Sequence, residues 1–504
     1  MIKQKAILIT GLILLTIYLN NCGSKSSTNG GTPSVPQGVT ATAGSGKITI
    51  SWTAVAGASS YNLYWSNTSG VTLTNGTKIA DVTSPYIQTG LTNGLTYNYV
   101  ITAVNANGES RQSAQVSVTL IPSVPQNLVA SGGDSQIALS WSTSTGTTSY
   151  NVYDSTTSSG QFTKVTSTAA TSYTMTGLTN GTTYYFVVTA VNSAGESLYS
   201  NQVVSIPYTS CTYDAGLYPF GIAIDTSGDI LVTNFVGSTI IALSPTGSII
   251  KTYNVLNPMG IAIDASGNIW VTNWSVGSVT ELLTTGGIGT YNVGTHPTNL
   301  AIDATGNVWV TNRDSANVTK LSSTGTIIGT YSTGASSGPQ SIAIDASGDV
   351  WVTGSYNNTV IELSSTGINI AIYGVGTGPT AMAIDPSGNI WVVNDLADII
   401  SKLYKVPPNG IAIESYAAGP DQSGIAIDTA GNMYIANYDN ATITKRSSSG
   451  SILGNFNVGT QPQNIAIDAS GNAWVTNYGS NTVTELIGIA KGPQYFPYAG
   501  PQWP

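Results

Sequence analysis

Apolar and polar residues alternate over short segments along most of the chain after residue 33, and clusters of Gly, Asn, Ser and Pro separate these segments. Alternation with a period of two predicts half-buried β-strands, and no segment beyond the leader shows helical periodicity. The pattern recurs seven times between Ile222 and Asn477, at spacings of 39 to 43 residues. A period near 40 residues, with four short strands in each copy, predicts a seven-bladed β-propeller built of four-stranded blades.

Two residue types recur at fixed positions in each copy. We interpret the aspartates as acceptors of backbone hydrogen bonds in tight hairpins, with calcium binding as the alternative. The large residues six positions later are expected to pack between blades, with stacking on a ligand as the alternative. The aspartates are Asp225, Asp264, Asp303, Asp345, Asp385, Asp428 and Asp468, and the large residues are Leu231, Trp270, Trp309, Trp351, Trp391, Tyr434 and Trp474.

The last copy lacks a fourth strand, because the pattern stops at Gly488. The segment Cys211 to Gly216 aligns with the outer strand of another copy, Gly289 to Gly294. We therefore expect residues near Thr212–Asp214 to complete the seventh blade, which removes a free sheet edge. This places the propeller at 208–490 and leaves the tail 491–504 without an assignment.

Residues 34–120 and 122–207 form a longer repeat before the propeller. Each copy contains a Trp in an apolar strand (Trp52 or Trp141), followed by a Leu-Thr-Asn-Gly turn and a Tyr (Tyr97 or Tyr184). This pattern resembles the fibronectin type III family, which implies immunoglobulin-like sandwiches of seven strands with a core Trp and a tyrosine corner. We interpret the two modules as spacers, with ligand binding as the alternative.

The N-terminus has the features of an export signal. Lys3 and Lys5 precede an apolar stretch from Ala6 to Leu19, which is short for a membrane span. The sequence at Cys22 resembles a bacterial lipoprotein signal with a relaxed cleavage site. The resemblance implies a signal peptide at 1–21, lipidation of Cys22 and a flexible tether at 22–33. The chain would then reside in the outer membrane or on the surface of a diderm bacterium; ordinary secretion is the alternative.

The content and sign of charged residues limit the classes of molecule that the protein is expected to bind. Charged residues make up 8% of the chain, and the net charge is −9. From residue 208 onward 19 Asp and Glu stand against 8 Lys and Arg, a net charge of −11. The chain has no basic stripe, so nucleic-acid binding is not expected. With Cys22 lipidated, Cys211 has no partner for a disulfide, and we expect a monomer that contacts the membrane through its lipid.

Candidate ligand-binding residues fall in two sets of propeller loops. Strands of a blade alternate in direction, so the loops between strands B and C and between strands D and A lie at the end opposite the Asp hairpins. The copies differ most in these loops, which suits binding. Aromatic and acidic side chains there would stack on sugars or bind peptides, unless the aromatics only fill the joints between blades. The candidates are Phe235, Trp274, His296, Arg313, Asp314, Asp395, Asp398, Tyr438, Asp439 and Tyr478.

The propeller repeats resemble the NHL family and, through the phrase Gly-Asn-x-Trp-Val-Thr, the propeller of the virginiamycin B lyase family. The resemblance implies the fold and, for an active lyase, a magnesium site with nearby His and Glu residues. This chain has one histidine, His296, and carries Asn where many lyase repeats carry Glu. No catalytic residue, metal ligand or cofactor can therefore be transferred. The asparagines that end strand B are expected to cap backbone groups.

The predicted fold is all-β, with two tandem sandwiches followed by the propeller. We favour a non-enzymatic, lipid-anchored envelope protein whose propeller binds a protein or a glycan. An exported lyase or hydrolase acting at the propeller mouth is the alternative.

Overall fold

The computed structural model describes residues 31–44, 46–406 and 410–490, which form strands, turns and two three-residue 3-10 helices. The leader, the first part of the tether with Cys22, and the tail lie outside the described residues. Within the described part of the chain, no helix is long and apolar enough to cross a membrane. The chain divides into two compact units, and the division falls between Ile121 and Pro122.

The first unit is a sandwich of a three-stranded sheet, β1-β2-β5, and a five-stranded sheet built around β3 and β6. Trp52 lies in the core between the sheets, 6% exposed, as predicted. The strands are β1 (Thr40–Gly44), β2 (Lys47–Ser51), β3 (Ser60–Ser66), β4 (Thr77–Val82), β5 (Tyr86–Thr89), β6 (Thr96–Asn105), β7 (Gly108–Glu109) and β8 (Val116–Thr119).

The second unit begins with a sandwich of the same topology, in which Trp141 takes the place of Trp52. Its strands are β9 (Val129–Gly133), β10 (Gln136–Ser140), β11 (Ser149–Ser155), β12 (Thr163–Thr168), β13 (Ser172–Thr176), β14 (Tyr184–Asn192), β15 (Gly195–Glu196) and β16 (Val203–Ser205).

The strand count of each sandwich is eight rather than the expected seven, because the last strand is split. In the first sandwich β7 and β8 both pair with β6. Between them, the hydroxyls of Ser110 and Ser113 accept hydrogen bonds from the backbone N–H groups of Ala103 and Ile101. The side chains replace ladder bonds there, so the regular strand is interrupted.

The tyrosine corner predicted from the sequence is present in both sandwiches. In the first, the hydroxyl of Tyr97 accepts a hydrogen bond from Thr92 N–H at 2.8 Å and donates to Thr92 O. In the second, the hydroxyl of Tyr184 accepts from Thr179 N–H at 3.3 Å. Each bond fixes the loop that leads into the longest strand of its sandwich.

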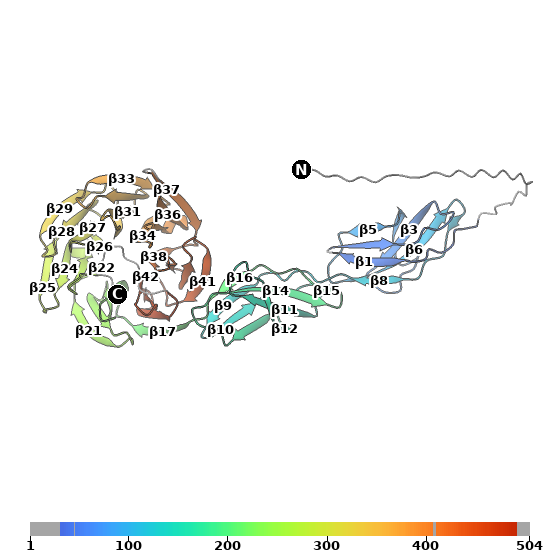
Figure 1. The fold of residues 1–504 in the computed structure, drawn as a ribbon, viewed down its shortest axis with the longest axis horizontal. Helices are drawn as coiled ribbons and strands as arrows, with labels where there is room; N and C mark the ends of the chain where they lie inside the picture. The colour runs from blue at the N-terminus through green and yellow to red at the C-terminus, as the bar shows by residue number, and fades with distance from the viewer. Residues whose placement is uncertain (1–30, 45, 407–409, 491–504) are drawn as a thin grey trace, which may run out of the picture. The chain divides into compact units, whose positions relative to one another are not determined.

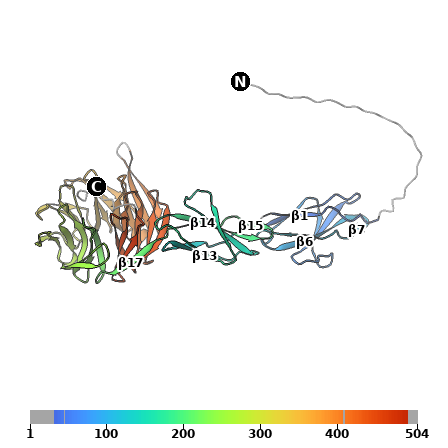
Figure 2. The ribbon, with the colours of Figure 1, turned by 60° about the horizontal axis from the view of Figure 1, so that its bottom comes forward.

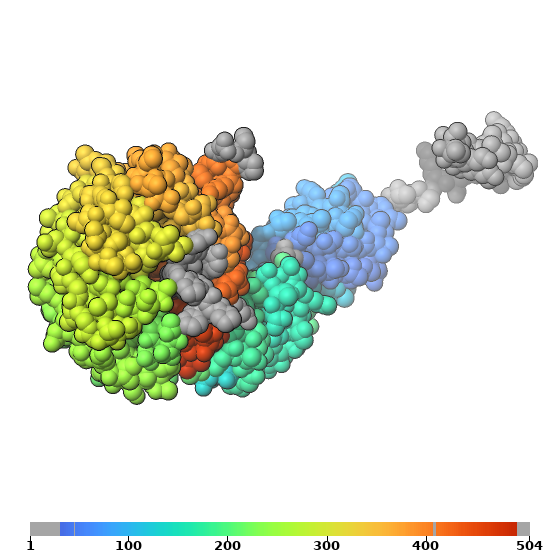
Figure 3. All heavy atoms as spheres, turned by 60° about the vertical axis from the view of Figure 1, so that its left-hand side comes forward, coloured from blue at the N-terminus to red at the C-terminus, as the bar shows by residue number. Residues whose placement is uncertain are grey.

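The propeller consists of seven four-stranded antiparallel sheets arranged in a ring (Figure 1). The blades follow one another around the ring in chain order (Figure 3). The inner strands A are β18 (Pro219–Ile224), β22 (Pro258–Ile263), β26 (Pro297–Ile302), β30 (Pro339–Ile344), β34 (Pro379–Ile384), β38 (Gln422–Ile427) and β42 (Pro462–Ile467). Strands B are β19 (Ile230–Asn234), β23 (Ile269–Asn273), β27 (Val308–Asn312), β31 (Val350–Gly354), β35 (Ile390–Asn394), β39 (Met433–Asn437) and β43 (Ala473–Asn477).

The outer half of each blade completes the meander. Strands C are β20 (Thr239–Leu243), β24 (Ser278–Leu282), β28 (Asn317–Leu321), β32 (Thr359–Leu363), β36 (Ile399–Val406), β40 (Thr442–Arg446) and β44 (Thr482–Ile487). Strands D are β21 (Ile249–Asn254), β25 (Ile288–Asn292), β29 (Ile327–Ser332), β33 (Asn369–Gly374), β37 (Gly410–Ala417), β41 (Ile452–Asn457) and, for the seventh blade, β17 (Thr209–Asp214). The 3-10 helices η1 (Trp274–Val276) and η2 (Asp395–Ala397) follow strands B of the second and fifth blades.

The repeated aspartate organises the hairpin between strands A and B. In the third blade, Asp303 Oδ1 accepts hydrogen bonds from the backbone N–H groups of Thr305 and Asn307 at 3.0 and 2.9 Å. Gly306 takes the positive φ of +82° that the turn requires. The hairpin interpretation of the repeated Asp is therefore confirmed.

The same aspartate also holds the large residue of strand B, a link that the sequence did not reveal. Asp303 Oδ2 accepts a hydrogen bond from Trp309 Nε1 at 3.0 Å. Equivalent bonds join Asp264 to Trp270 (3.1 Å), Asp345 to Trp351 (3.1 Å), Asp385 to Trp391 (2.9 Å) and Asp468 to Trp474 (3.0 Å). In the sixth blade the hydroxyl of Tyr434 shares its one proton between Asp428 Oδ2 at 3.1 Å and Ile489 O at 2.7 Å.

The large residues pack between blades, as predicted. Trp270 lies in a cluster with Leu300 and Val310 of the next blade, and it is fully buried. Trp309 packs in the same way against Ile342 and Val352 of the fourth blade. The core of the propeller is thus a series of apolar layers between neighbouring sheets.

The first strand of the propeller segment, β17, closes the ring, as predicted. β17 pairs antiparallel with β44 over its whole length, from Thr209 opposite Ile487 to Asp214 opposite Thr482. Figure 2 shows β17 beside the last blade. Tyr213 stacks on Trp474 with ring centroids 5.7 Å apart, and its hydroxyl donates to Glu485.

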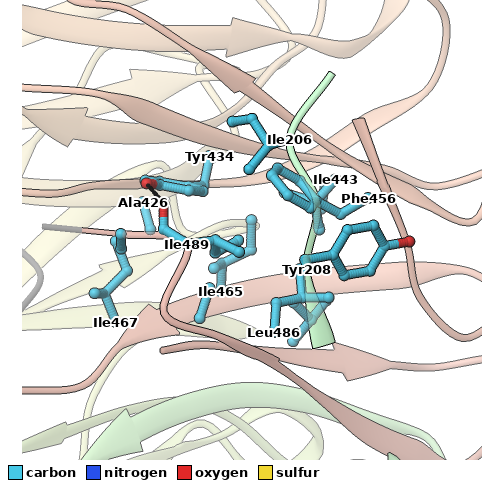
Figure 4. Close-up of a cluster of buried hydrophobic side chains, with 14 residues drawn as sticks. Ile206, Tyr208, Ala426, Tyr434, Ile443, Phe456, Ile465, Ile467, Leu486 and Ile489 are labelled. Carbon is cyan, nitrogen blue, oxygen red and sulfur yellow. Dashed lines mark hydrogen bonds between the residues drawn. The ribbon is translucent and has the colours of Figure 1, made fainter. Parts of the chain in front are cut away.

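The second sandwich is attached to the propeller by a short apolar contact. Ile206 and Tyr208, which follow β16, pack against Phe456 on β41 (Figure 4). The rings of Tyr208 and Phe456 meet edge to face at 5.0 Å. The Tyr208 hydroxyl also accepts a hydrogen bond from Asn457 N–H.

We expect Asp303→Ala to lower the free energy of unfolding by about 2–3 kcal/mol at pH 7, because it removes several hydrogen bonds to a charged acceptor. Burial opposes ionisation, but hydrogen bonds from Thr305, Asn307 and Trp309 lower the pKa of Asp303 to about 2. A depressed folded-state pKa gives stability that is present above the unfolded pKa of about 3.9 and is lost as the pH falls through the folded value. The difference in melting temperature between the wild type and Asp303→Ala should therefore shrink as the pH is lowered from 5 to 2.

The variant Asp303→Asn is the matched control, because it keeps acceptor oxygen but removes the charge. It should lose less stability than Asp303→Ala. A melting temperature that rises on addition of calcium would contradict the hairpin role.

Candidate functional site

The loops between strands B and C and between strands D and A form one end of the propeller, which we call the mouth face. The antiparallel order of strands in every blade places the Asp hairpins at the opposite end, which we call the hairpin face. All ten candidate residues lie in mouth-face loops, and they fall into three groups, of which two adjoin each other. Large apolar side chains are also exposed on this face: Leu217, Tyr218, Val236, Leu256, Val276, Tyr356 and Leu396.

A central channel runs along the propeller axis. Its volume is about 750 Å³, and all seven inner strands line it. At the mouth face it reaches Asp395, Asp421 and Tyr438, and at the hairpin face it reaches Asp225 and Asp468. The lining between these ends is largely the Ile and Ala side chains of the repeated strand A.

The first group of candidates is an aromatic pocket between the blades at the two ends of the propeller sequence. Phe235, Tyr438 and Tyr478 line a cavity of about 250 Å³ together with Phe220 and Met259. Tyr478 also contacts Tyr218 at a centroid distance of 4.6 Å. These rings are partly exposed and border open volume. Flat aromatic faces beside a cavity are suited to stacking on a ligand.

The second group is a set of carboxylates in the fifth and sixth blades. The structure brings Asp395, Asp398 and Asp439 together and adds Asp421. Burial, followed by the charges of the other three carboxylates, raises the pKa of Asp395. A side-chain hydrogen bond with Asp439 raises the pKa of Asp421. No Lys or Arg of the described residues pairs with these four carboxylates.

The acidic group and the aromatic pocket share one residue. Tyr438 lines both the channel and the aromatic pocket, and it directly precedes Asp439. Burial raises the pKa of Tyr438, and the neighbouring Tyr478 and Asp439 contribute to the shift. The two groups therefore form a continuous surface with apolar faces on one side and hydrogen-bond acceptors on the other.

The third group lies across the second, third and fourth blades. His296 stacks on Trp274 with centroids 4.4 Å apart, and its Nδ1 lies 2.6 Å from Asp314 Oδ2. The guanidinium of Arg313 lies over the rings of Trp274 and Tyr356, 5.9 and 5.0 Å from their centroids. His296 and Asp314 bond to each other, whereas Arg313 lies over two rings and its buried Nε has no hydrogen-bond partner among the described residues, so this group is a packed polar and aromatic surface.

The asparagines that end strand B act differently from the expected backbone caps. Asn312 Nδ2 donates to the side chains of Asn317 and Thr319 on strand C, and Asn477 Nδ2 donates to Thr482 and Thr484. Each Asn thus ties two strands together beneath the mouth-face loop. In these two blades strand C supplies Asn or Thr at these positions, so side-chain partners replace backbone ones. Asn394 and Asn437 also donate to backbone carbonyls, as the expected caps would: Asn394 to Val392 and Ile399, and Asn437 to Thr442.

Several residues of the mouth were missed by the sequence reasoning. Asp421 and Tyr356 lie in mouth-face loops, but neither directly follows strand B. Phe220, Met259 and Gln463 occupy the second position of strand A, where the seven copies carry Phe, Met, Thr, Gln, Thr, Ser and Gln. Variation at this position, next to the uniform Ala and Ile positions, was the signal that could have identified them.

Two family models match parts of the chain. Residues 34–119 and 123–206 match the model of the fibronectin type III domain, and residues 250–492 match that of the virginiamycin B lyase family. The chain thus carries two fibronectin type III domains and a virginiamycin B lyase-like propeller region.

Solved structures agree with this fold. A streptogramin B lyase structure is similar with a TM-score of 0.51 and 19% identity, covering 55% of this chain and 97% of that one. A virginiamycin B lyase from Staphylococcus aureus gives a TM-score of 0.50 and 16% identity, covering 56% and 99%. At these identities the likeness concerns the fold alone.

Curated relatives include carbohydrate-active enzymes. Exoglucanase B of Cellulomonas fimi is 32% identical over 234 residues, 41% of this chain and 20% of the relative. Chitinase A1 of Niallia circulans is 32% identical over 238 residues, 43% of this chain and 32% of the relative. The chain spans no more than about a third of the length of these relatives.

The magnesium site implied by the lyase resemblance does not fit the residues present. His296 is the single histidine; its Nδ1 contacts Asp314 and one ring face is covered by Trp274. Among the described residues, no three His, Cys, Asp or Glu side chains are grouped so that they could hold a metal ion.

We expect Asp395→Asn to stabilise the propeller at neutral pH, because it removes a charge that is partly buried among like charges. A carboxyl whose folded pKa is raised destabilises the fold once the pH exceeds its unfolded pKa, and this cost reaches its full size above the folded pKa. The melting temperature should rise by roughly 1–3 °C at pH 7 and be unchanged near pH 3. Asp314→Asn, which breaks a favourable contact with His296, is the control and should not stabilise. A lower melting temperature for Asp395→Asn at pH 7 would contradict the repulsion.

Proposed function

We propose that the mouth face of the propeller binds a glycan, and that the protein is a non-catalytic, lipid-anchored component of the bacterial envelope. The observation that carries the ligand class is the aromatic pocket of Phe235, Tyr438 and Tyr478 next to the carboxylates of Asp395 and Asp439. Sugar rings present apolar faces that stack on aromatic rings and hydroxyls that donate to carboxylates. A pocket with both features side by side matches this chemistry.

Two alternatives have an observation in their favour. The exposed apolar side chains around the mouth, such as Tyr356 and Leu396, would suit a protein ligand. The raised pKa of Asp395 would suit a general acid in an exported lyase or hydrolase. The similarity of the chain to parts of an exoglucanase and a chitinase is consistent with a glycan ligand or substrate, but those relatives extend well beyond the matched segments.

The envelope location is supported by the leader, by Cys22 and by the polar tether before the first sandwich. Two fibronectin type III domains between the tether and the propeller would act as spacers. The low content of charged residues is consistent with an exported β-rich protein. We infer a monomer whose contact with the membrane is made by the lipid on Cys22.

Tyr438→Ala and Tyr478→Ala should each weaken glycan binding at least tenfold, because each removes one wall of the aromatic pocket. Binding would be measured on a glycan and host-protein array with the full chain, followed by calorimetry on the best ligand. Tyr199→Ala is the matched control, since Tyr199 is an exposed tyrosine of the second sandwich.

The array also separates the alternatives. If the array shows binding to a protein but to no glycan, the ligand is a protein and the proposed ligand class is wrong. If the protein cleaves a glycan and Asp395→Asn abolishes that cleavage, the propeller is an enzyme and the proposed non-catalytic role is wrong. Equal binding by the two pocket variants and the wild type would contradict the site.

Cys22→Ser should move the protein from the membrane to the soluble fraction of the envelope, because the acyl chains would have no attachment site. The measurement is detergent partitioning of the full chain expressed in a diderm host. Cys211→Ser is the matched control and should stay with the membrane. A Cys22→Ser protein that still partitions with membranes would contradict the lipid anchor.

A further inference from the structure

The chain leaves the last blade in the direction of the propeller axis. After β44 ends at Ile487, Gly488 takes a φ of +67°. The outer strand position of this blade is already filled by β17, so the chain cannot continue outward. Instead, Ile489 is buried in the cluster that contains Ala426 and Ile467 of two inner strands (Figure 4). The exit from the propeller is therefore a fixed, packed segment.

The last described residue lies next to the opening of the channel. The backbone N–H of Ala490 donates to Gly471 O at 3.0 Å, in the hairpin of the seventh blade. Ala469, two residues before Gly471, lines the channel. Lys445 Nζ and the Tyr434 hydroxyl both donate to Ile489 O and hold this segment at the hairpin face. The chain therefore continues from a point within a few residues of the channel wall.

The channel offers surface for a bound segment. Its volume of about 750 Å³ lies within the range of ligand cavities, roughly 300–1,000 Å³. Ile and Ala side chains of the inner strands make its apolar wall, and Asn299, Gln340 and Asn464 add amide groups that could bond to a peptide backbone. Asp225 and Asp468 give the hairpin-face opening a negative charge. The channel thus suits an extended, largely apolar segment with a positive charge at its entrance.

Residues 491–504 have this chemistry. The segment reads Lys-Gly-Pro-Gln-Tyr-Phe-Pro-Tyr-Ala-Gly-Pro-Gln-Trp-Pro, with one charge, at Lys491, and four aromatic residues. Four prolines favour an extended conformation of about 3.1 Å per residue, so the segment can reach roughly 40 Å. An inner strand of six residues spans about 20 Å. The segment is therefore long enough to pass through the whole channel.

We propose that residues 491–504 bind in the central channel of the same chain, entering from the hairpin face, with Lys491 beside the hairpin carboxylates and the aromatic residues against the apolar wall. This inference does not rest on the proposed glycan binding, because it concerns the opposite opening of the channel.

The first test separates the segment from the chain. A chain that ends at Ala490 is titrated into a fluorescein-labelled peptide of residues 491–504, and binding is followed by fluorescence anisotropy. The peptide should bind the shortened chain at least tenfold more tightly than the full chain, whose channel is already filled. A peptide with Tyr495→Ser, Phe496→Ser and Tyr498→Ser is the control and should not bind. Equal affinity for both chains, or no binding to a shortened chain that melts cooperatively, would overturn the proposal.

The second test keeps the chain at full length, in case the shortened chain does not fold. Asn299→Cys is introduced into a background with Cys22→Ser and Cys211→Ser, and the rate of maleimide labelling is measured. Labelling should be at least tenfold faster when Tyr495, Phe496 and Tyr498 are changed to Ser, and unchanged for the matched variant Gln494→Ser. Equal rates in all variants would overturn the proposal. Protection that disappears on dilution together with a dimer peak in size-exclusion chromatography would assign the channel to the tail of a second copy, which also overturns it.

Discussion

The bond between the hairpin aspartate and the large residue of strand B is the interaction on which the propeller depends. One carboxylate fixes two things: its Oδ1 closes the hairpin at the inner edge of the blade, and its Oδ2 orients the ring that fills the space to the next blade. Local geometry and packing between blades are thereby set by the same residue. In the first blade the large residue is Leu231, which has no N–H or hydroxyl to donate to Asp225. Asp225 still accepts the hairpin hydrogen bonds, and Leu231 contributes only apolar packing.

Closure of the ring repeats this packing with a strand from the other end of the propeller sequence. Tyr213 covers Trp474 as Tyr291 covers Trp270 and Tyr331 covers Trp309. A glycine in the turn between strands C and D of the following blade allows each contact, because a Cβ at Gly247, Gly325 or Gly367 would lie about 2 Å from the Tyr ring. β17 therefore supplies a missing side chain as well as a missing strand, and the last blade becomes equivalent to the others.

The scaffold could be predicted from the sequence because each repeated residue has the same structural role in all seven blades. Period, strand order, closing strand and packing role of the Trp residues all follow from that repetition. The bond from Asp303 to Trp309 did not follow, because a spacing of six residues across a hairpin shows proximity but not orientation. The grouping of Asp395 with Asp439 and Asp421 was equally out of reach, since it depends on which neighbouring loops converge. Strand parity placed the ten candidate residues at the same end of the propeller, as the structure does, and three-dimensional placement divided them into three groups.

The four mouth carboxylates are one place where the structure departs from what stability requires. Every hairpin aspartate accepts hydrogen bonds from its own turn, and Asp303 also lies 3.4 Å from Lys320. Asp395 is instead held partly buried among Asp398, Asp421 and Asp439, which raises its pKa and costs folding free energy. Nothing in the repeat requires acids there, because the other blades fold with Phe235, Ser355 or Tyr478 at the position of Asp395. This group is costly to the fold and adjoins an open aromatic pocket, and the proposed ligand site is built on that combination.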